Sequence, residues 1–294
     1  MPELDYFIVD VFTDTALAGN PLAVVMNTAH LTTARMQSIA REFNLSETTF
    51  VERRAADVEA AEGIRTRIFT TQEELPFAGH PTLGTASVLK LTDPSAVRDS
   101  TITLAENVGP IPVRFDPERK NLFGEMTQRN PEFGAELDPA RVADLTGLAL
   151  DDLDPAAPPQ VVSTGSGFAI VVLRSVDALA RLNVRQQEAT QYLRPLGARW
   201  FYVMAPDAQG PVRARMQFNG GEDPATGSAA GCAISYLVSR GIVPSQQQVH
   251  VRQGVEMGRP SDLFLSANLD TLKVTEVRVA GSTVLVATGR LLLP

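Results

Sequence analysis

The stretch Gly220–Cys232, GGEDPATGSAAGC, combines two adjacent carboxylates, a proline and four glycines with a run of small residues that can start a helix. Glu74–Gly84, ELPFAGHPTLG, has the same layout in the first half of the chain. Aligning the two stretches at an offset of 148 residues superposes Glu74 on Glu222, Pro76 on Pro224 and Gly79 on Gly227. The offset is about half of the 294 residues. The sequence therefore predicts a duplicated lobe, with one glycine-rich loop in each copy.

The duplication extends beyond the two loops. Two further segments match: Arg65 and Arg67 align with Arg213 and Arg215 at an offset of 148, and Gly19–Val25, GNPLAVV, matches Gly165–Val172, GSGFAIVV, at an offset of 146. A period of this size is that of a domain, because solenoid repeats are only about 20–50 residues long. The matches indicate two copies of one domain-sized unit.

The domain boundaries follow from this period and from composition. We expect an N-terminal lobe at 1–128 and a C-terminal lobe at 129–294. Residues 128–159 are rich in proline and acidic residues, which is typical of a linker. The last predicted strand, 283–292, could pair with either lobe, and the sequence leaves this open.

Alternating apolar residues and turn residues predict the same order of elements in both halves. In the first half we expect strands at Tyr6–Phe12, Pro21–Met26, Thr48–Glu52, Ile64–Thr70, Thr101–Leu104, Pro110–Phe115 and Asn121–Thr127, with helices at Thr32–Phe43 and about Thr82–Lys90. In the second half we expect helices near Pro139–Leu145 and at Gln186–Leu196 and Gly227–Ser239, with strands at Gly165–Val172, Trp200–Met204, Val212–Phe218, Val249–Arg252 and onward to Leu293.

Composition narrows the class of protein. The net charge is −8 and the pI about 5.0, which argues against nucleic acid or an anionic membrane as a partner. The single cysteine, Cys232, excludes an internal disulfide and a cysteine-rich zinc site. The N-terminal residues lack the pattern of a secretory signal, and no apolar run reaches about 20 residues. We expect a soluble cytoplasmic protein.

Each glycine loop leads into a helix, and a helix start offers unpaired N–H groups and a partial positive charge. Such a site suits a carboxylate or an oxyanion. Neither loop matches the phosphate-binding patterns GxxxxGK[ST] or GxGxxG, so we do not expect nucleotide binding. The alternative is that both loops are only helix caps in tight turns, since caps use the same residue types. Two matched loops that both carry titratable side chains favour a functional site.

Three titratable residues are the candidates for chemistry. His80 lies in the first loop and Asp223 in the second, and His80 aligns with Ser228, so the loops share a frame but not their side chains. Glu47 lies in NLSETTFV, between a predicted helix end and a strand, with hydroxyl residues on either side. Taken alone, Glu47 would sooner be interpreted as a solvated turn residue or as part of a turn hydrogen bond.

At these residues the sequence resembles the phenazine-biosynthesis PhzF-like family. The resemblance rests on blocks that span nearly the whole chain: AGNPLAVV at 18–25, EFNLSETTFV at 42–51, ELPFAGHPTLGTA at 74–86, GGEDPATGSAAG at 220–231 and RQGVEMGRPS at 252–261. It implies an α/β (α+β) fold like that of diaminopimelate epimerase. In that fold two pseudo-symmetric lobes each wrap a curved, mostly antiparallel sheet around a central helix, with the site in the cleft between them.

The resemblance also implies an activity. The characterised member of the family isomerises trans-2,3-dihydro-3-hydroxyanthranilate, and the glutamate that moves the proton there corresponds to Glu47. The substrate-holding histidine, aspartate and serine correspond to His80, Asp223 and Ser228, and the backbone at Gly79, Gly221 and Gly227 is expected to contact the ligand. Diaminopimelate epimerase uses one catalytic cysteine on each loop, whereas this chain has none on either, which excludes a two-thiol mechanism. A homodimer is expected on the same basis.

The chemistry that follows is a hypothesis. Glu47, partly desolvated, would have its pKa raised toward neutrality and would move a proton on a small, cyclic amino acid or related carboxylate. No organic cofactor is required, and the three histidines lie too far apart in sequence to predict a metal site. An epimerase or lyase that uses the same proton abstraction is an alternative, and so is a non-catalytic protein that binds a small acid.

Overall fold

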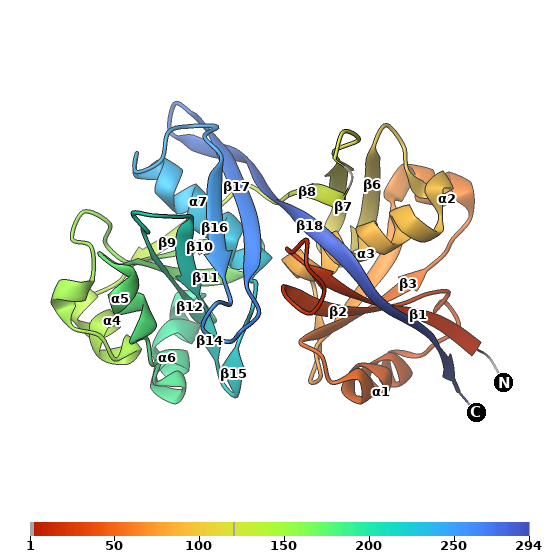
Figure 1. The fold of residues 1–294 in the computed structure, drawn as a ribbon, viewed down its shortest axis with the longest axis horizontal. Coiled ribbons are helices and arrows are strands. Elements are labelled where there is room, and N and C mark those ends of the chain that lie inside the picture. Colours follow the sequence, from red (N-terminus) through yellow and green to blue (C-terminus); the bar gives the residue numbers. More distant parts are fainter. Residues whose placement is uncertain (1–2, 120, 294) are drawn as a thin grey trace. The chain divides into compact units, whose positions relative to one another are not determined.

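The computed structural model describes residues 3–119 and 121–293. Contacts divide the chain into two compact units (Figure 1). Unit 1 holds the described residues up to Thr127 together with those from Ala280 onward, and unit 2 holds Gln128–Val279. The last strand, β18 at Lys273–Leu292, contributes residues to both units.

Unit 1 is a curved sheet around one buried helix. Its elements are β1 Glu3–Val11, β2 Asn20–Val25, α1 Thr33–Phe43, β3 Glu47–Glu52, α2 Ala56–Glu62, β4 Ile64–Phe69, β5 Glu74–Leu75, α3 Gly79–Thr92, β6 Thr101–Glu106, β7 Gly109–Phe115 and β8 Leu122–Thr127. The strand order is β1-β2-β3-β4-β6-β7-β8, and β18 pairs with both β8 and β1, which closes the sheet. Every residue of α3 from Gly79 to Leu89 is buried, because the strands surround the helix.

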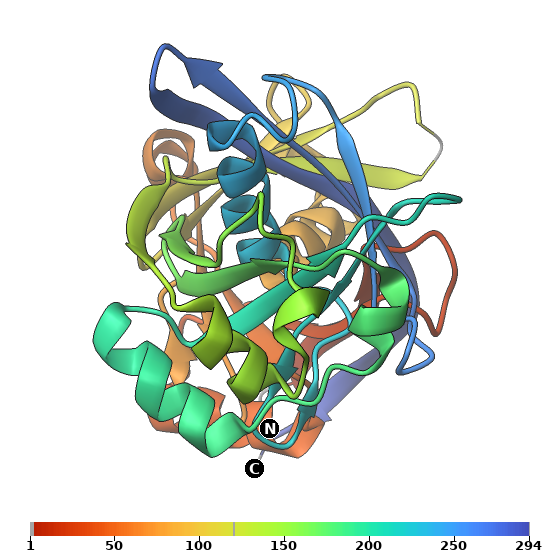
Figure 2. The ribbon, with the colours of Figure 1, turned by 90° about the vertical axis from the view of Figure 1, so that its left-hand side faces the viewer.

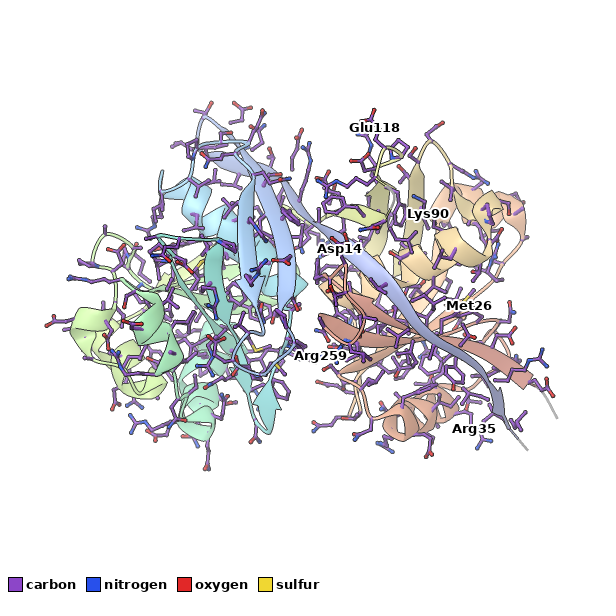
Figure 3. All side chains as sticks on the ribbon, viewed as in Figure 1. Asp14, Met26, Arg35, Lys90, Glu118 and Arg259 are labelled. Carbon is purple, nitrogen blue, oxygen red and sulfur yellow. The ribbon has the colours of Figure 1, made fainter. Side chains whose placement is uncertain are left out.

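The C-terminal end of the chain completes the sheet of unit 1. Thr283–Leu292 of β18 pairs antiparallel with β1, which answers the question that the sequence left open. At the other end of the central helix, the ammonium of Lys90 in the last turn of α3 lies 4.4 Å from the centre of the Phe115 ring (Figure 3). A cation at this end of a helix also favours the helix dipole.

Unit 2 repeats this design around α7. Its elements are β9 Glu132–Glu136, α4 Pro139–Thr146, β10 Gln160–Ser163, β11 Gly167–Val172, α5 Val176–Ala180, α6 Gln186–Leu193, β12 Trp200–Ala205, β13 Val212–Arg215, β14 Gln217–Phe218, β15 Gly221–Glu222, α7 Gly227–Ser239, β16 Val249–Gln253 and β17 Ser261–Asp270. The strand order is β17-β16-β13-β12-β11-β10-β9. Alternate residues of β11 and β12 pack against α4, α5 and α6, the green helices in the foreground of Figure 2.

The expected α/β repeat is confirmed. In unit 1 the parallel pairs are β2 with β3 and β4 with β6, and in unit 2 they are β11 with β12 and β13 with β16. The two central helices begin at Gly79 and Gly227, which are 148 residues apart as in the sequence alignment. The other pairings, among them β1 with β2 and β18, β3 with β4, β6 with β7, β7 with β8, β10 with β11 and β16 with β17, are antiparallel, so each sheet is mixed and mostly antiparallel.

Glycines inside the central helices allow this close packing. A Cβ atom on Gly84 of α3 would lie 2.6 Å from Leu22 Cδ2 and 2.8 Å from Val11 Cγ2. A Cβ atom on Gly231 of α7 would lie 2.0 Å from Gln128 Oε1. Real Cβ contacts are longer than this, so a larger residue at either position would require the neighbouring side chain to move, from the sheet at Gly84 and from Gln128 at Gly231.

Several elements differ from the sequence expectations. The segment 128–159, expected as a linker with one short helix, contains that helix as α4 but also the strand β9, and it forms part of unit 2. All five residues of β9 are exposed, so this edge strand carries no apolar alternation that would reveal it. The short elements β10 and α5 were also not predicted, and none of the helices in the described residues is long and apolar enough to cross a membrane.

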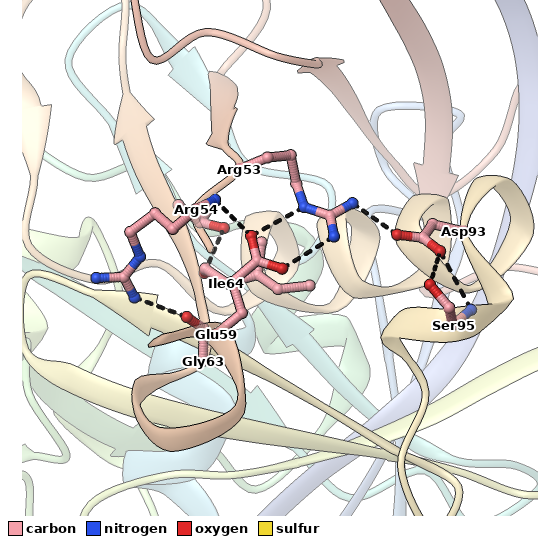
Figure 4. A network of polar contacts seen from close by, with 8 residues as sticks. Arg53, Arg54, Glu59, Gly63, Ile64, Asp93 and Ser95 are labelled. Atoms are coloured by element: carbon pink, nitrogen blue, oxygen red, sulfur yellow. Dashed lines mark hydrogen bonds and ion pairs between the residues drawn. The ribbon is translucent and has the colours of Figure 1, made fainter. Parts of the chain in front are cut away.

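Helix α2 was missed for a related reason. None of its residues is buried, so it lacks the apolar periodicity of an amphipathic helix. Ion pairs hold it instead (Figure 4). The Arg53 guanidinium binds both carboxylate oxygens of Glu59 at 2.9 Å and reaches Asp93 at 2.6 Å, while Arg54 binds Glu62 at 2.7 Å. The Arg53–Asp93 contact joins side chains 40 residues apart, and none of these contacts involves the apolar residues from which periodicity predicts a helix.

Candidate active site

An arginine–glutamate pair anchors each glycine loop in the same way. In unit 1, Arg67 Nε and Nη2 donate to the two oxygens of Glu74 at 2.9 and 2.6 Å. In unit 2, Arg215 Nε and Nη2 donate to Glu222 at 2.8 and 2.6 Å. These four residues are the ones that the internal sequence alignment superposed. The bidentate pair ties the end of an alternating strand to the loop that follows it, and so fixes where each helix begins.

The anchoring pairs give Glu74 and Glu222 structural roles. The bonds from Arg67, followed by one from Asn107, lower the pKa of Glu74, so it stays a carboxylate at neutral pH. Arg215 also donates to the carbonyls of Leu179 and Ala180, which connects the second loop to α5. The two loop glutamates are thus anchors, and the titratable groups left for chemistry are those that the sequence singled out.

Glu47 and His80 are brought together in unit 1. Glu47 is the first residue of β3, and His80 is the second residue of α3. His80 Nε2 lies 3.5 Å from Glu47 Oε2, and only 5% of the His80 side chain and 16% of the Glu47 side chain are exposed. A carboxylate is therefore held against an imidazole at the start of the central helix, in a largely desolvated position.

The neighbours of His80 determine its protonation state. Burial lowers the pKa of His80 to about 3, and the backbone of Pro21 acts in the opposite direction. The Asn20 amide nitrogen lies 3.2 Å from His80 Nδ1. An amide nitrogen only donates, so Nδ1 accepts and the single ring proton lies on Nε2, on the side of Glu47. His80 is therefore neutral, and its Nε2 lies 3.5 Å from the Glu47 carboxylate, a distance that a substrate or a small shift could close to a hydrogen bond.

The neutral ring leads to a prediction. The His80 ring resonances should not titrate between pH 5 and 7, whereas a free imidazole has a pKa of about 6.5. The unfolded chain then binds a proton that the folded chain does not, so this residue should lower stability as pH falls through that window. Histidine NMR spectra across pH, with His80→Gln to assign the signal, test this. A midpoint near 6.5 for the His80 signal would contradict it.

The position equivalent to Glu47 in unit 2 is occupied by Trp200. Glu47 pairs in register with Leu22 of β2, and Trp200 pairs with Phe168 of β11. Leu22 and Phe168 are equivalent at the 146-residue offset of that segment. The duplication thus places an acid at the start of this strand in unit 1 and an aromatic ring in unit 2, so the two units are not chemically equivalent.

Asp223 is the centre of a polar cluster in unit 2. Its side chain accepts a hydrogen bond from the Thr226 hydroxyl at 2.7 Å. Gln253 Nε2 donates to the Asp223 carbonyl at 2.7 Å, and Gln253 Oε1 accepts from the Thr226 N–H at 3.1 Å. Burial and then the charge of Asp223 raise the pKa of Tyr202, a buried residue of β12. Asp223 is therefore held rigidly at the start of α7.

The remaining predicted binding residues lie at the helix starts. Gly79 begins α3, and Gly227 and Ser228 begin α7, while Gly221 lies on the short strand β15. Neither Ala78 nor Thr226, the cap residues, makes a side-chain capping bond to the first turn of its helix. This leaves both helix N-termini suited to an anionic group.

Cys232 takes no part in such a site. It is buried within α7, with its sulfur 3.5 Å from the Ser166 carbonyl oxygen and 3.6 Å from Thr164 Oγ1. Burial raises the pKa of the Cys232 thiol to about 11. Over the residues that the structure describes, no cluster of three His, Cys, Asp or Glu side chains could hold a metal ion.

Sequence reasoning assigned no role to three residues that the structure places in these clusters: Asn20, Thr226 and Gln253. Each is polar and buried, and each contacts a predicted site residue or its neighbour. All three lie inside the motif blocks AGNPLAVV, GGEDPATGSAAG and RQGVEMGRPS. Local patterns gave no signal for Asn20 and Gln253, whose partners His80 and Asp223 lie 60 and 30 residues away, whereas Thr226 contacts Asp223 within its own loop.

A family model described as a phenazine biosynthesis-like protein, PhzC-PhzF, matches residues 9–289. The chain belongs to this family. The trans-2,3-dihydro-3-hydroxyanthranilate isomerase of Pseudomonas fluorescens is 35% identical to it, over 98% of this chain and 99% of that protein.

Solved structures of PhzF-like proteins are similar over the full length. A PhzF-family protein from Bacillus anthracis superposes with a TM-score of 0.86 at 25% identity and covers 100% of both chains. A predicted epimerase from Pseudomonas aeruginosa has a TM-score of 0.85 at 33% identity, over 99% of this chain and all of that one. The expected family and fold are confirmed, and the PhzF-like chain is an enzyme of the isomerase class that acts on a small molecule.

Proposed function

We propose that this PhzF-like protein is a proton-shuttling isomerase of a small, cyclic amino acid or related carboxylate, with Glu47 as general acid and base. The observation that supports the proposal most is the buried Glu47–His80 contact of 3.5 Å at the start of α3. A desolvated carboxylate at a helix N-terminus, beside a neutral N–H donor, is suited to accept a proton from carbon and to return it.

The reaction needs only one acid–base group. Glu47 would take a proton from an activated C–H bond, the electrons of that bond would form a new double bond, and the proton would return at the far end of the conjugated system. The double bond moves and the composition of the substrate stays the same, so no oxidant or reductant is required. His80 would donate its Nε2–H to Glu47 or to a substrate heteroatom as charge moves.

Asp223 and Ser228 are proposed to act on the same substrate. Asp223 is held by Thr226 and its backbone by Gln253, so its carboxylate is preorganised to bind an ammonium or hydroxyl group. The uncapped start of α7 at Gly227 would favour the substrate carboxylate, with Gly221 and Gly79 as further backbone contacts. The named activity of the Pseudomonas fluorescens relative makes dihydro-hydroxyanthranilate the first substrate to test.

Proton NMR in D₂O tests this function. The purified protein is incubated with trans-2,3-dihydro-3-hydroxyanthranilate and with a panel of cyclic and β-hydroxy amino acids. Isomerisation would appear as double-bond migration, with deuterium at the new C–H bond to the extent that the Glu47 carboxyl exchanges its proton with D₂O before returning it. A new diastereomer with deuterium at the original carbon would instead indicate an epimerase, and loss of water or ammonia a lyase. Ligand-induced shifts without any exchange would favour a binding protein.

A further inference from the structure

A second carboxyl group is buried close to the start of α3. Glu106 is the last residue of β6, and only 5% of it is exposed. Its Oε1 lies 2.6 Å from the hydroxyl of Thr82 on α3. In the described part of the chain, its Oε2 is buried and makes no hydrogen bond. A buried carboxylate with one oxygen unsatisfied would be costly, so the protonation state of Glu106 needs a physical explanation.

The contacts of Thr82 supply that explanation. The Thr82 hydroxyl lies 2.7 Å from the carbonyl oxygen of Ala78 as well as 2.6 Å from Glu106 Oε1. A hydroxyl has one hydrogen and cannot donate to both oxygens. If Glu106 is protonated, it donates to Thr82, and Thr82 donates to Ala78, so both contacts become hydrogen bonds. Burial also raises the pKa of Glu106 to about 8, against smaller opposing effects of Thr82 and Arg65.

In unit 2 a neutral residue at the equivalent strand position holds the start of the central helix. Arg65 of β4 pairs with Ala105 of β6, and in unit 2 Arg213 pairs with Arg252. The next residues along are Glu106 and Gln253, which are therefore equivalent. Gln253 also holds the start of its central helix, through the Thr226 N–H at 3.1 Å and the Thr226 hydroxyl at 2.9 Å. Protonated Glu106, like this amide, has both a donor group and a carbonyl acceptor, although the amide carries two donor hydrogens and the acid one.

We propose that Glu106, in its protonated form, is a positioning residue that fixes the start of α3 and thereby holds His80 beside Glu47. Ala78, at the end of the Glu106–Thr82–Ala78 chain, is the cap residue of α3 and lies two positions before His80. When Glu106 ionises, the Thr82 hydrogen turns to the carboxylate and the Ala78 carbonyl loses that bond. The part of this proposal that concerns catalysis depends on the isomerase function proposed above.

The charged groups around Glu106 are few. The charge of Arg65 on β4 slightly lowers the pKa of Glu106. Arg65 itself donates hydrogen bonds to the Ala105 carbonyl at 3.1 Å and to Asn107 at 2.6 Å. On α3 the contact is the uncharged Thr82, and His80 in the same turn is neutral. On β7 the residue in register with Glu106 is Gly109. Ionisation of Glu106 is thus the change expected to disturb the first turn of α3 in mildly alkaline solution.

The first experiment follows the His80 ring by NMR from pH 6 to 9.5 and needs no substrate. In the wild type we expect a shift of the His80 signal with a midpoint near pH 8, where Glu106 ionises. Glu106→Gln should remove that shift, because its amide keeps the donor at all pH values. Glu118→Gln, at an exposed turn residue, is the control and should retain it (Figure 3). Absence of the shift in the wild type, or its persistence in Glu106→Gln, would overturn the proposal.

The second experiment compares pH profiles of kcat and KM. Glu106→Gln should keep neutral-pH kcat within about threefold and lose the alkaline decrease seen in the wild type. Glu106→Leu should lower kcat at all pH values by up to ~10²-fold, as displaced catalytic groups do. If Glu106→Gln lost as much activity as Glu106→Leu while staying folded by circular dichroism, the positioning role would be refuted. If no isomerase activity is found at all, the NMR experiment still decides the role of Glu106.

Discussion

Replacing Glu47 by glutamine is expected to lower kcat by ~10²–10⁴-fold while KM changes little, because positioned acid–base groups contribute about that much to the rate. Glutamine has the shape of glutamate and keeps an amide group beside His80 Nε2, which lies 3.5 Å from Glu47 Oε2 in the wild type. It cannot accept a proton from carbon. Binding and packing should therefore survive while proton transfer is lost, which initial rates and deuterium exchange measured side by side would show.

The matched control is Glu42→Gln, an exposed residue five positions earlier at the end of α1. This variant makes the same chemical change to net charge and should leave kcat within about twofold. If Glu47→Gln exchanged substrate deuterium at the wild-type rate, Glu47 would not be the acid–base group. The search would then move to Asp223, the other buried acid of the predicted set.

The second large effect is expected on stability. Arg215→Met should lower the free energy of unfolding by about 3–5 kcal/mol, because it leaves the Glu222 carboxylate buried without its partner. The side chains of Arg215 and Glu222 are only 9% and 13% exposed, and the bond is bidentate. Removing Arg215 also takes a donor from the Leu179 and Ala180 carbonyls. Urea denaturation followed by circular dichroism measures the change.

Two further variants make this test specific. Arg141→Met breaks a surface pair with Asp144 whose side chains are 40% and 50% exposed, and it should cost less than about 1 kcal/mol. The double variant Arg215→Met, Glu222→Leu should recover much of the loss, because no buried charge then remains. A loss in Arg215→Met no larger than in Arg141→Met would show that the second glycine loop does not depend on this pair.

The internal repeat could be recognised in the sequence because the elements that repeat are specified by residues close together in the chain. A strand, a glycine loop and a helix start each depend on neighbouring residues, so both copies kept the same residue types 148 positions apart. The alignment even superposed Arg67 and Glu74 on Arg215 and Glu222. It did not show that each arginine binds its own glutamate, because that contact requires β4 and β13 to bring the side chains across a turn.

The sequence predicted the candidate acid–base residues of the site but not the residues that hold them in place. Glu47 and His80 were named from their motifs, and the structure places them 3.5 Å apart. Asn20, which determines the tautomer of His80, and Glu106, which holds the first turn of α3, had no local signal. Both act through partners on other strands or helices, and β9 and α2 were missed because neither has a buried face that periodicity could reveal.

The sequence alone therefore determined the family and the duplicated α/β order and named the candidate residues for the chemistry, because motif, propensity and period are properties of nearby residues. Only the tertiary structure decided that His80 is neutral, that Glu106 retains a proton and that the loop glutamates are anchors. Protonation and pairing depend on burial and on side chains that lie up to 60 residues apart, as Asn20 and His80 do. Desolvation energy belongs to the folded chain, so no local pattern of residues contains it.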